Sequence, residues 1–195
     1  LEEGEGGKVG IEAANVQRSA RDTSASDAVA VAVAMGADFG GVAAALSIGV
    51  GLARNEIGTD VAAYLQDIDN SIKTAGNIGL EAISKNSIES TAAAAAVAAA
   101  ISGSTAVALG GAGADATNII LGNTHAYIRN SNLGSATDSV NTVALTALDE
   151  SSIVAKIVGG AAAVAGSGDV GVSGAIGAAL ARNLIGWELD GNGDA

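Results

Sequence analysis

The chain alternates between short apolar runs and long stretches rich in Ala, Val and Gly. The short runs, at 61–65, 71–74 and 78–83, are bounded by Gly, Asn, Asp and Ser, which is typical of strands joined by turns. Residues 28–33 read Ala-Val-Ala-Val-Ala-Val, a strict period of two. That period predicts a strand, because successive side chains of a strand point to opposite faces.

Each long stretch is interrupted near its middle, at 36–41, 102–104 and 166–169. Because Gly, Ser and Asp favour turns, each stretch is predicted to form two long strands that run out and back. A helix is the competing interpretation of 91–101, since Ala is the best helix former. The corresponding stretch 170–180 contains three Gly, however. Corresponding stretches should share one structure, so strands are predicted throughout.

Short segments recur along the chain at a nearly constant interval. The motif around Asn55 (ARNEIG) returns around Asn118 (ATNII) and again around Asn183 (ARNLIG). Tyr64 returns as Tyr127 after the same interval. The segment 78–82 corresponds to 143–147 and, more loosely, to 9–13. We therefore expect one repeat array over 1–195, with copies at 1–58, 59–121 and 122–186 and an acidic flank at 187–195.

A recurring unit made of strands predicts an all-β fold, a parallel β-solenoid (β-helix) of about three 64-residue repeats. Each coil would hydrogen-bond to the next at the usual strand spacing of ~4.8 Å. Equivalent side chains would then form ladders, as they do in other stacked β structures. The expected ladder residues are Asn55, Asn118 and Asn183, together with Tyr64 and Tyr127.

The composition modifies this picture, because 49% of the residues are hydrophobic but only 2% are aromatic, with 28 Gly and no Pro. Ala and Gly can fill a close-packed interior only where backbones approach closely. The net charge of −12 argues against a nucleic-acid partner. The absence of Cys excludes disulfides and thiolate sites. Residues 90–114 carry no charge, but they are mostly small, and no membrane span is predicted.

Few residues offer chemistry, and we expect no enzyme and no required cofactor. The single His125 cannot form a paired metal site and is expected to face solvent. The Gly-rich segment 110–113 lacks the Lys and Ser/Thr of a phosphate-binding loop. Calcium is a possible cofactor, since Asp190, Asn192 and Asp194 follow the D-x-N-x-D spacing that begins an EF-hand loop.

The repeat style resembles that of giant bacterial surface adhesins of the filamentous-haemagglutinin-like type, whose stalks are Ala/Gly/Val-rich β-solenoids. The motif at 181–186 and the Ala-Tyr segments carry this resemblance, which extends over about residues 9–187. It implies an extracellular or cell-surface structural segment of a fibre or adhesin stalk. We expect self-association end to end or covalent neighbouring repeats. The alternative is a carbohydrate-active or carbohydrate-binding β-helix module.

Overall fold

The computed structural model describes residues 2–4, 8–68, 72–73, 76–134 and 139–186, and in these ranges the chain is all-β. The prediction of strands is confirmed, and the Ala-rich segment 91–101 lies inside a strand. The strands are β1 (Glu2–Gly4), β2 (Lys8–Glu12), β3 (Val16–Asp22), β4 (Ala25–Gln66), β5 (Ile72–Lys73), β6 (Asn77–Ser84), β7 (Ser87–Arg129), β8 (Thr142–Asp149), β9 (Ser152–Ser167) and β10 (Val170–Ile185).

The strands belong to two compact units, each built from three separate segments of the chain. Unit 1 comprises Leu1–Ala25, Ile57–Ser87 and Ile120–Ser152. Unit 2 comprises Ser26–Glu56, Ile88–Ile119 and Ile153–Ala195. The long strands β4 and β7 contribute residues to both units. No helix in the described ranges is long and apolar enough to cross a membrane.

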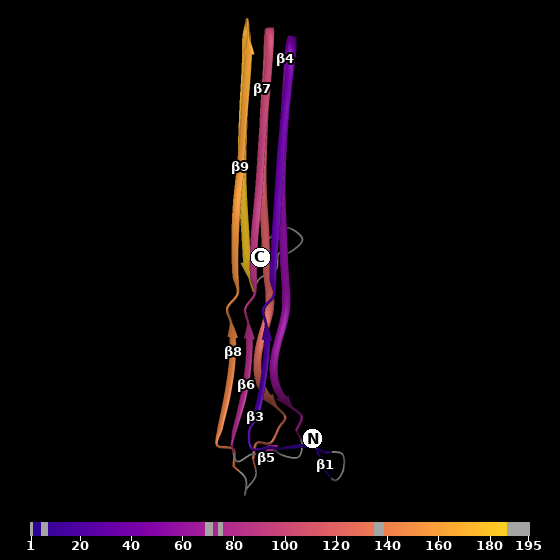
Figure 1. The fold of residues 1–195 in the computed structure, drawn as a ribbon, viewed down its shortest axis with the longest axis vertical. Helices are drawn as coiled ribbons and strands as arrows, with labels where there is room; N and C mark the ends of the chain where they lie inside the picture. Colours follow the sequence, from indigo (N-terminus) through magenta and orange to yellow (C-terminus); the bar gives the residue numbers. More distant parts are fainter. Residues whose placement is uncertain (1, 5–7, 69–71, 74–75, 135–138, 187–195) are drawn as a thin grey trace. The chain divides into compact units, whose positions relative to one another are not determined.

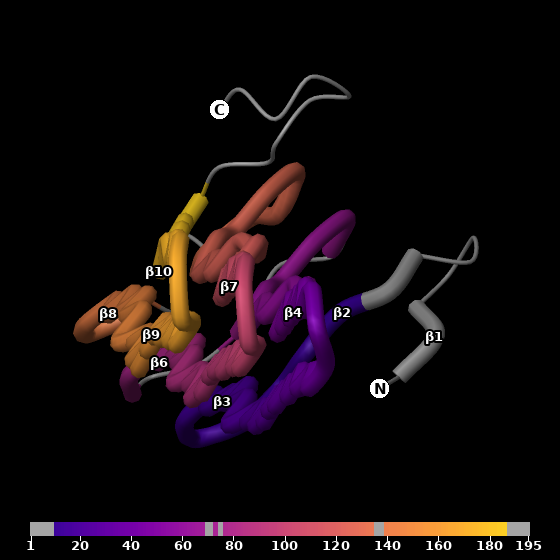
Figure 2. Tube along the Cα trace, turned by 90° about the horizontal axis from the view of Figure 1, so that it is seen from above, coloured from indigo at the N-terminus to yellow at the C-terminus, as the bar shows by residue number. Residues whose placement is uncertain are grey.

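The main sheet of unit 1 is parallel, with the order β3-β6-β8 (Figures 1 and 2). Its register joins Ile78 of β6 directly to Val143 of β8, and Ala82 to Ala147. The predicted correspondence between 78–82 and 143–147 is therefore confirmed as strand pairing. A smaller sheet has the order β1-β2-β5, in which β1 and β2 are antiparallel and β2 and β5 are parallel.

The looser sequence match of 9–13 to 78–82 is wrong. The partner of Ile78 is Val16 rather than Val9, so the paired segment lies further along the chain, in β3. At the start of this register both paired side chains, Val16 and Ile78, are buried. Because β3 contains Arg18 and Arg21, its sequence does not resemble that of β6, although both arginines lie within the paired segment.

In unit 2, β7 lies between β4 and β10, and β9 also pairs with β7 (Figure 2). The chain reverses direction within β4 and brings Gly36 close to Leu46. A Cβ atom built on Gly36 would lie 2.6 Å from the carbonyl oxygen of Leu46. β9 ends at Ser167 and β10 begins at Val170, so the third predicted turn is confirmed. The residues of the other two predicted turns, 36–41 and 102–104, lie within strands β4 and β7. Their residues bond to neighbouring segments, as when the Ser104 hydroxyl donates to the Gly41 carbonyl oxygen.

The interior of unit 2 is formed almost entirely by alanine. The buried residues of its two clusters are Ala53, Ala92, Ala94, Ala96, Ala112, Ala114 and Ala116, and Ala43, Ala45, Ala98, Ala100, Ala106 and Ala108. Such small side chains bring the layers close enough that Cβ atoms on Gly49 and Gly51 would each lie 2.7 Å from a backbone oxygen. The large side chains of the same strands point outward, which inverts the usual division between core and surface.

Unit 1 has a conventional core, in which Ile72, Ile78 and Leu80 are at most 1% exposed. Val61, Leu65 and the partly buried Ile128 pack with them. Burial of each such branched side chain contributes roughly 1.5–3 kcal/mol. Because the two clusters inside unit 2 bury alanine methyl groups, its stability depends more heavily on strand pairing and on the polar side chains described next.

Candidate assembly site

The predicted asparagine ladder is present in unit 2. The side-chain amide of Asn55 donates to Oδ1 of Asn118 at 2.9 Å, and the Asn118 amide donates to Oδ1 of Asn183, also at 2.9 Å. Asn118 is fully buried, whereas Asn183 is exposed at the side of the sheet formed by β10. The structure thus brings together one asparagine from each of the three predicted copies.

Two serines complete the ladder, and the sequence analysis missed both. The Ser26 hydroxyl donates to Oδ1 of Asn55 at 2.8 Å, and the Asn118 amide also donates to the Ser90 hydroxyl at 2.8 Å. Ser26 and Ser90 are separated by the repeat interval, so the repeat was a signal that could have identified them. Through these bonds every polar atom of the Asn118 side chain has a partner in a low-dielectric interior.

The ladder has a direction, since each amide N–H points from β4 toward β10. Among the described residues, the Asn183 amide nitrogen donates to no protein group, whereas its Oδ1 accepts from Asn118. The strand that carries Asn183 is a terminal strand of its sheet. Terminal strands present unpaired backbone groups, which are templates for further pairing. A further asparagine placed beyond β10 would continue the same bonding pattern.

The two predicted tyrosines stack in unit 1. The rings of Tyr64 and Tyr127 have centroids 5.2 Å apart and planes inclined by 6°. The stack lies near the surface, because Tyr64 is 47% exposed. Aromatic pairs of this kind contribute about 0.5–1.5 kcal/mol beyond the area that they bury.

Replacing Tyr127 with leucine is expected to lower the free energy of unfolding by about 0.5–1.5 kcal/mol, because the stack is lost. Tyr127→Phe serves as the matched control, since it keeps the ring and should leave stability nearly unchanged. Urea unfolding of the two variants measures the difference. Equal destabilisation by both variants would assign the effect to the hydroxyl and contradict the stacking argument.

Other polar pairs in unit 1 repeat at the same interval. The amides of Asn123, Asn130 and Asn141 donate respectively to Asp60 at 2.9 Å, to Asp67 at 3.0 Å and to Asn77 at 3.0 Å. Asp67 and Asn130 both have positive φ, at 54° and 46°. Asn and Asp tolerate this left-handed conformation better than most residues do. The two turns therefore repeat in both backbone conformation and side-chain chemistry.

Hydrogen bonds hold the pKa of Asp67 below its usual value. The Gln66 amide contributes most and the Asn130 amide next, with a smaller contribution from the charge of Arg129. Because the pKa is lowered on folding, the associated stabilisation is fully present above the ordinary Asp value. It is lost as the pH falls through the lowered folded value.

A carboxyl-carbon NMR titration should show the pKa of Asp67 rising in both Gln66→Ala and Asn130→Ala, with the larger rise in Gln66→Ala. Arg129→Ala is the matched control and should produce the smallest rise. Both amide donors favour the charged carboxylate, so removing either one favours the protonated form. An unchanged pKa in Gln66→Ala would contradict the assignment of the main cause.

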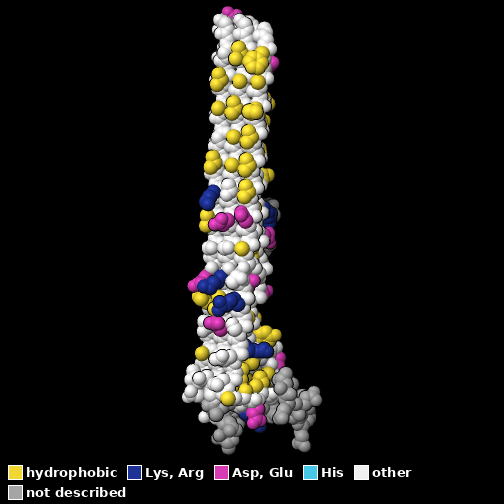
Figure 3. All heavy atoms as spheres, in the orientation of Figure 1, with side chains coloured by type: hydrophobic (Ala, Val, Ile, Leu, Met, Phe, Trp, Pro, Cys, Tyr) yellow, Lys and Arg dark blue, Asp and Glu magenta, His cyan; other side chains and the backbone are white. Residues whose placement is uncertain are grey.

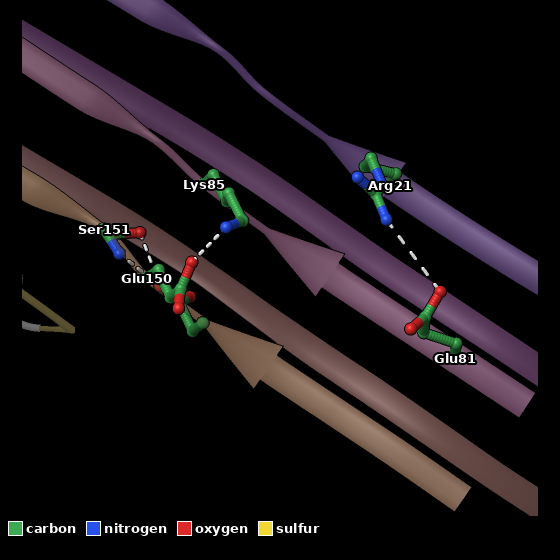
Figure 4. Close-up of polar contacts among 6 residues, drawn as sticks. Arg21, Glu81, Lys85, Glu150 and Ser151 are labelled. Carbon is green, nitrogen blue, oxygen red and sulfur yellow. Dashed lines mark hydrogen bonds and ion pairs between the residues drawn. The ribbon is translucent and has the colours of Figure 1, made fainter.

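Ion pairs also join neighbouring strands of unit 1 (Figure 4). Arg21, in β3, lies 3.9 Å from Glu81, in β6, and Lys85 pairs with Glu150. All four side chains are about half exposed, so solvent screens these interactions. Each pair is therefore worth roughly 0–1 kcal/mol and supports the strand register more than the overall stability.

The residues considered for chemistry do not converge. His125 is exposed, and the calcium candidates Asp190, Asn192 and Asp194 lie outside the described residues. In the described part of the chain no group of three or more His, Cys, Asp or Glu could hold a metal ion. A hollow of about 390 Å³ lies on the β3-β6-β8 sheet, lined by Gln17, Arg18, Ser19, Gly79, Leu80, Glu81, Ala144 and Thr146.

The chain matches no protein-family model, no curated protein and no solved structure.

Proposed function

We propose that the chain is a segment of a parallel β-solenoid that serves as a structural part of an extracellular fibre or adhesin stalk. Its coils are the three copies at 1–58, 59–121 and 122–186. The observation that supports this proposal best is the ladder from Asn55 through Asn118 to Asn183, which is directional and ends on a terminal strand. Equivalent residues of successive copies are hydrogen-bonded to each other, as they would be in a continuing stack.

The strand registers support the same proposal. β3, β6 and β8 pair in parallel, and each strand is one repeat interval from the next, which is the pairing expected if each copy lies on its neighbour. A stack of this kind can add another copy at either side without changing its internal contacts. The added copy can be a covalent neighbour or a second chain. Addition of second chains by one repeated contact produces an open filament rather than a closed ring.

The charge of the chain agrees with an extracellular fibre that stays soluble until it assembles. The net charge of −12 causes chains to repel one another in dilute salt. Repulsion between exposed charges falls as salt shortens the Debye length to about 10 Å at 0.1 M. End-to-end growth is therefore expected to increase with ionic strength.

Electron microscopy and fibre diffraction of the concentrated chain test the proposal directly. We expect filaments with an axial layer spacing of ~4.8 Å, the separation of hydrogen-bonded strands. Filament length should increase between low and moderate salt at constant protein concentration. A stable, monodisperse monomer at high concentration in both salts would contradict end-to-end association.

A further inference from the structure

We infer that an end-to-end contact between two chains contains a proton-binding site, in which the carboxyl group of Asp149 from one chain and that of Asp22 from the next share one proton. Neither chain holds this site alone, because each contributes one of the two carboxyl groups. The inference rests on the proposed function, since it concerns the contact through which chains would add end to end. The site lies at the terminal strands of the β3-β6-β8 sheet and does not involve the rows of hydrophobic side chains visible in Figure 3.

The strand register places the two carboxyl groups in one column. Asp22 of β3 lies directly opposite Ser84 of β6, and Ser84 lies directly opposite Asp149 of β8. β3 and β8 are the two terminal strands of this sheet. If a second chain continues the parallel register, its β3 lies against β8 of the first chain, and its Asp22 lies opposite Asp149. The two Cα atoms are then about 4.8 Å apart.

The middle strand shows how strongly a second neighbour shields this column from solvent. Ser84, which has a paired strand on each side, is 2% exposed. Asp22 is half-buried and Asp149 is exposed, and each lies on a terminal strand. In a continuing stack both would have a strand on each side, as Ser84 has. The contact therefore removes two adjacent carboxyl groups from water, which is costly while both are charged.

The hydrogen-bond donors to these carboxyl groups in the described ranges are neutral. The Ser24 hydroxyl donates to Oδ1 of Asp22 at 3.0 Å. The Ser151 hydroxyl and backbone amide donate to Oδ1 of Asp149, at 2.5 and 3.0 Å. Such bonds satisfy oxygen atoms but leave the charge in place. Because two carboxylates that share a site cannot both remain ionised, one accepts a proton and donates a hydrogen bond to the other.

The cations near the column do not supply the missing positive charge. Arg21 lies 3.9 Å from Glu81, and Lys85 pairs with Glu150. On the face of β3 that carries the carboxyl group, the nearest cation is Arg18, four positions away. That separation corresponds to about 13 Å along the strand. Neutralisation within the contact is therefore left to a proton.

A neighbouring carboxylate increases the need for that proton. Asp60 of β4 and Asp22 of β3 line the same hollow of about 450 Å³. The Asp60 carboxylate accepts a hydrogen bond from the Asn123 amide, which leaves its charge in place. A nearby negative charge favours the protonated form of a carboxyl group.

Uptake of one proton per contact fixes the pH dependence of growth. The assembled state binds one more proton than the separated chains, so acid favours assembly. By linkage, the chain concentration at which filaments appear should fall about ten-fold for each unit by which the pH is lowered. The measurement runs from mildly alkaline to mildly acidic pH at constant ionic strength, with filaments collected by sedimentation.

Isosteric neutral variants test the shared proton. Asp22→Asn and Asp149→Asn each leave one carboxyl group in the contact, so growth needs no proton. At neutral pH we expect either variant to form filaments at a concentration at least about ten-fold lower than the unmodified chain, with little pH dependence and an unchanged β circular dichroism spectrum. The matched control is Glu89→Gln, which changes the net charge equally at an exposed position of the middle strand β7. It should grow as the unmodified chain does.

Cross-linking tests the register separately. The chain has no Cys, so a mixture of an Asp149→Cys chain and an Asp22→Cys chain carries one cysteine at each side of the contact. Oxidation should produce dimers of twice the 18.6 kDa mass, because directly opposite Cα atoms lie within disulfide range. Arg21→Cys in place of Asp22→Cys is the control, since its side chain points to the opposite face of β3 and should give no dimer.

The possible results separate this inference from the proposed function. Filaments of the unmodified chain with an unchanged pH dependence in Asp22→Asn, or with the same gain in Glu89→Gln, would overturn the inference and leave the proposed function standing. Cross-linked dimers without filaments would support the contact and contradict the proposed fibre alone. Absence of both filaments and dimers in every variant would contradict both.

Discussion

Replacing Asn118 with alanine is expected to lower the free energy of unfolding by about 2–4 kcal/mol, because buried polar groups lose their partners. The side chain is completely buried and takes part in three hydrogen bonds, with Asn55, Ser90 and Asn183. Its removal leaves the Asn55 amide and the Ser90 hydroxyl without this partner in positions that water reaches poorly. Each buried polar group that loses its partner costs about 1–3 kcal/mol.

The matched control is Asn183→Ala, at the exposed end of the same ladder. It removes one bond, and the Asn118 amide keeps its bond to the Ser90 hydroxyl, so about 0.5–1.5 kcal/mol is expected. Urea unfolding of the two variants, followed by circular dichroism, measures both values. If the two variants are equally destabilised, the ladder does not depend on burial and the argument for Asn118 fails.

The ladder was predictable because the asparagines recur in similar motifs at a nearly fixed interval. The same reasoning could have included Ser26 and Ser90, which are separated by that interval. They were overlooked because serine is common in this chain and no surrounding motif distinguishes them. A repeat identifies equivalent positions, but it does not reveal which neighbouring hydroxyl completes a hydrogen-bonding group.

The register of β3 could not be predicted from similarity, because strand pairing preserves the alternation of faces and not the residue type. Arg18 pairs with Leu80 in the observed register, although the two side chains have nothing in common chemically. The residue pattern of segment 9–13 is similar to that of 78–82, and this similarity led to the wrong predicted correspondence. Only the three-dimensional pairing distinguishes the two possibilities.

The exposure of the valines of unit 2 follows from the small space inside the unit. The high alanine content of the chain suggests this feature but does not establish it. In the alternating segment 28–33, Val29, Val31 and Val33 are 66–70% exposed, while the alanines between them face inward. Alanine is preferred inside because the facing layers leave no room for a larger side chain. The apolar outer faces are therefore a consequence of the thin interior.

Gly51→Ala is the most direct test of that thin interior, and we expect it to lower the free energy of unfolding by about 1–3 kcal/mol. The added Cβ would lie 2.7 Å from the carbonyl oxygen of Ala93 and 3.5 Å from that of Ala30. Both are backbone atoms, so no side chain can rotate away and the strands themselves must move apart. Overpacking outweighs the smaller gain, about 0.4–1 kcal/mol, from reduced flexibility of the unfolded chain.

Gly160→Ala is the matched control, because a Cβ there would meet no atom within 4 Å and the residue is exposed. That variant should be neutral or stabilised by up to about 1 kcal/mol. Adding Gly49→Ala to Gly51→Ala should cost less than the sum of the two single changes, since strands already separated at one position accommodate the second more easily. Full additivity, or equal stability of Gly51→Ala and Gly160→Ala, would show that the layers are not held as closely as the alanine interior implies.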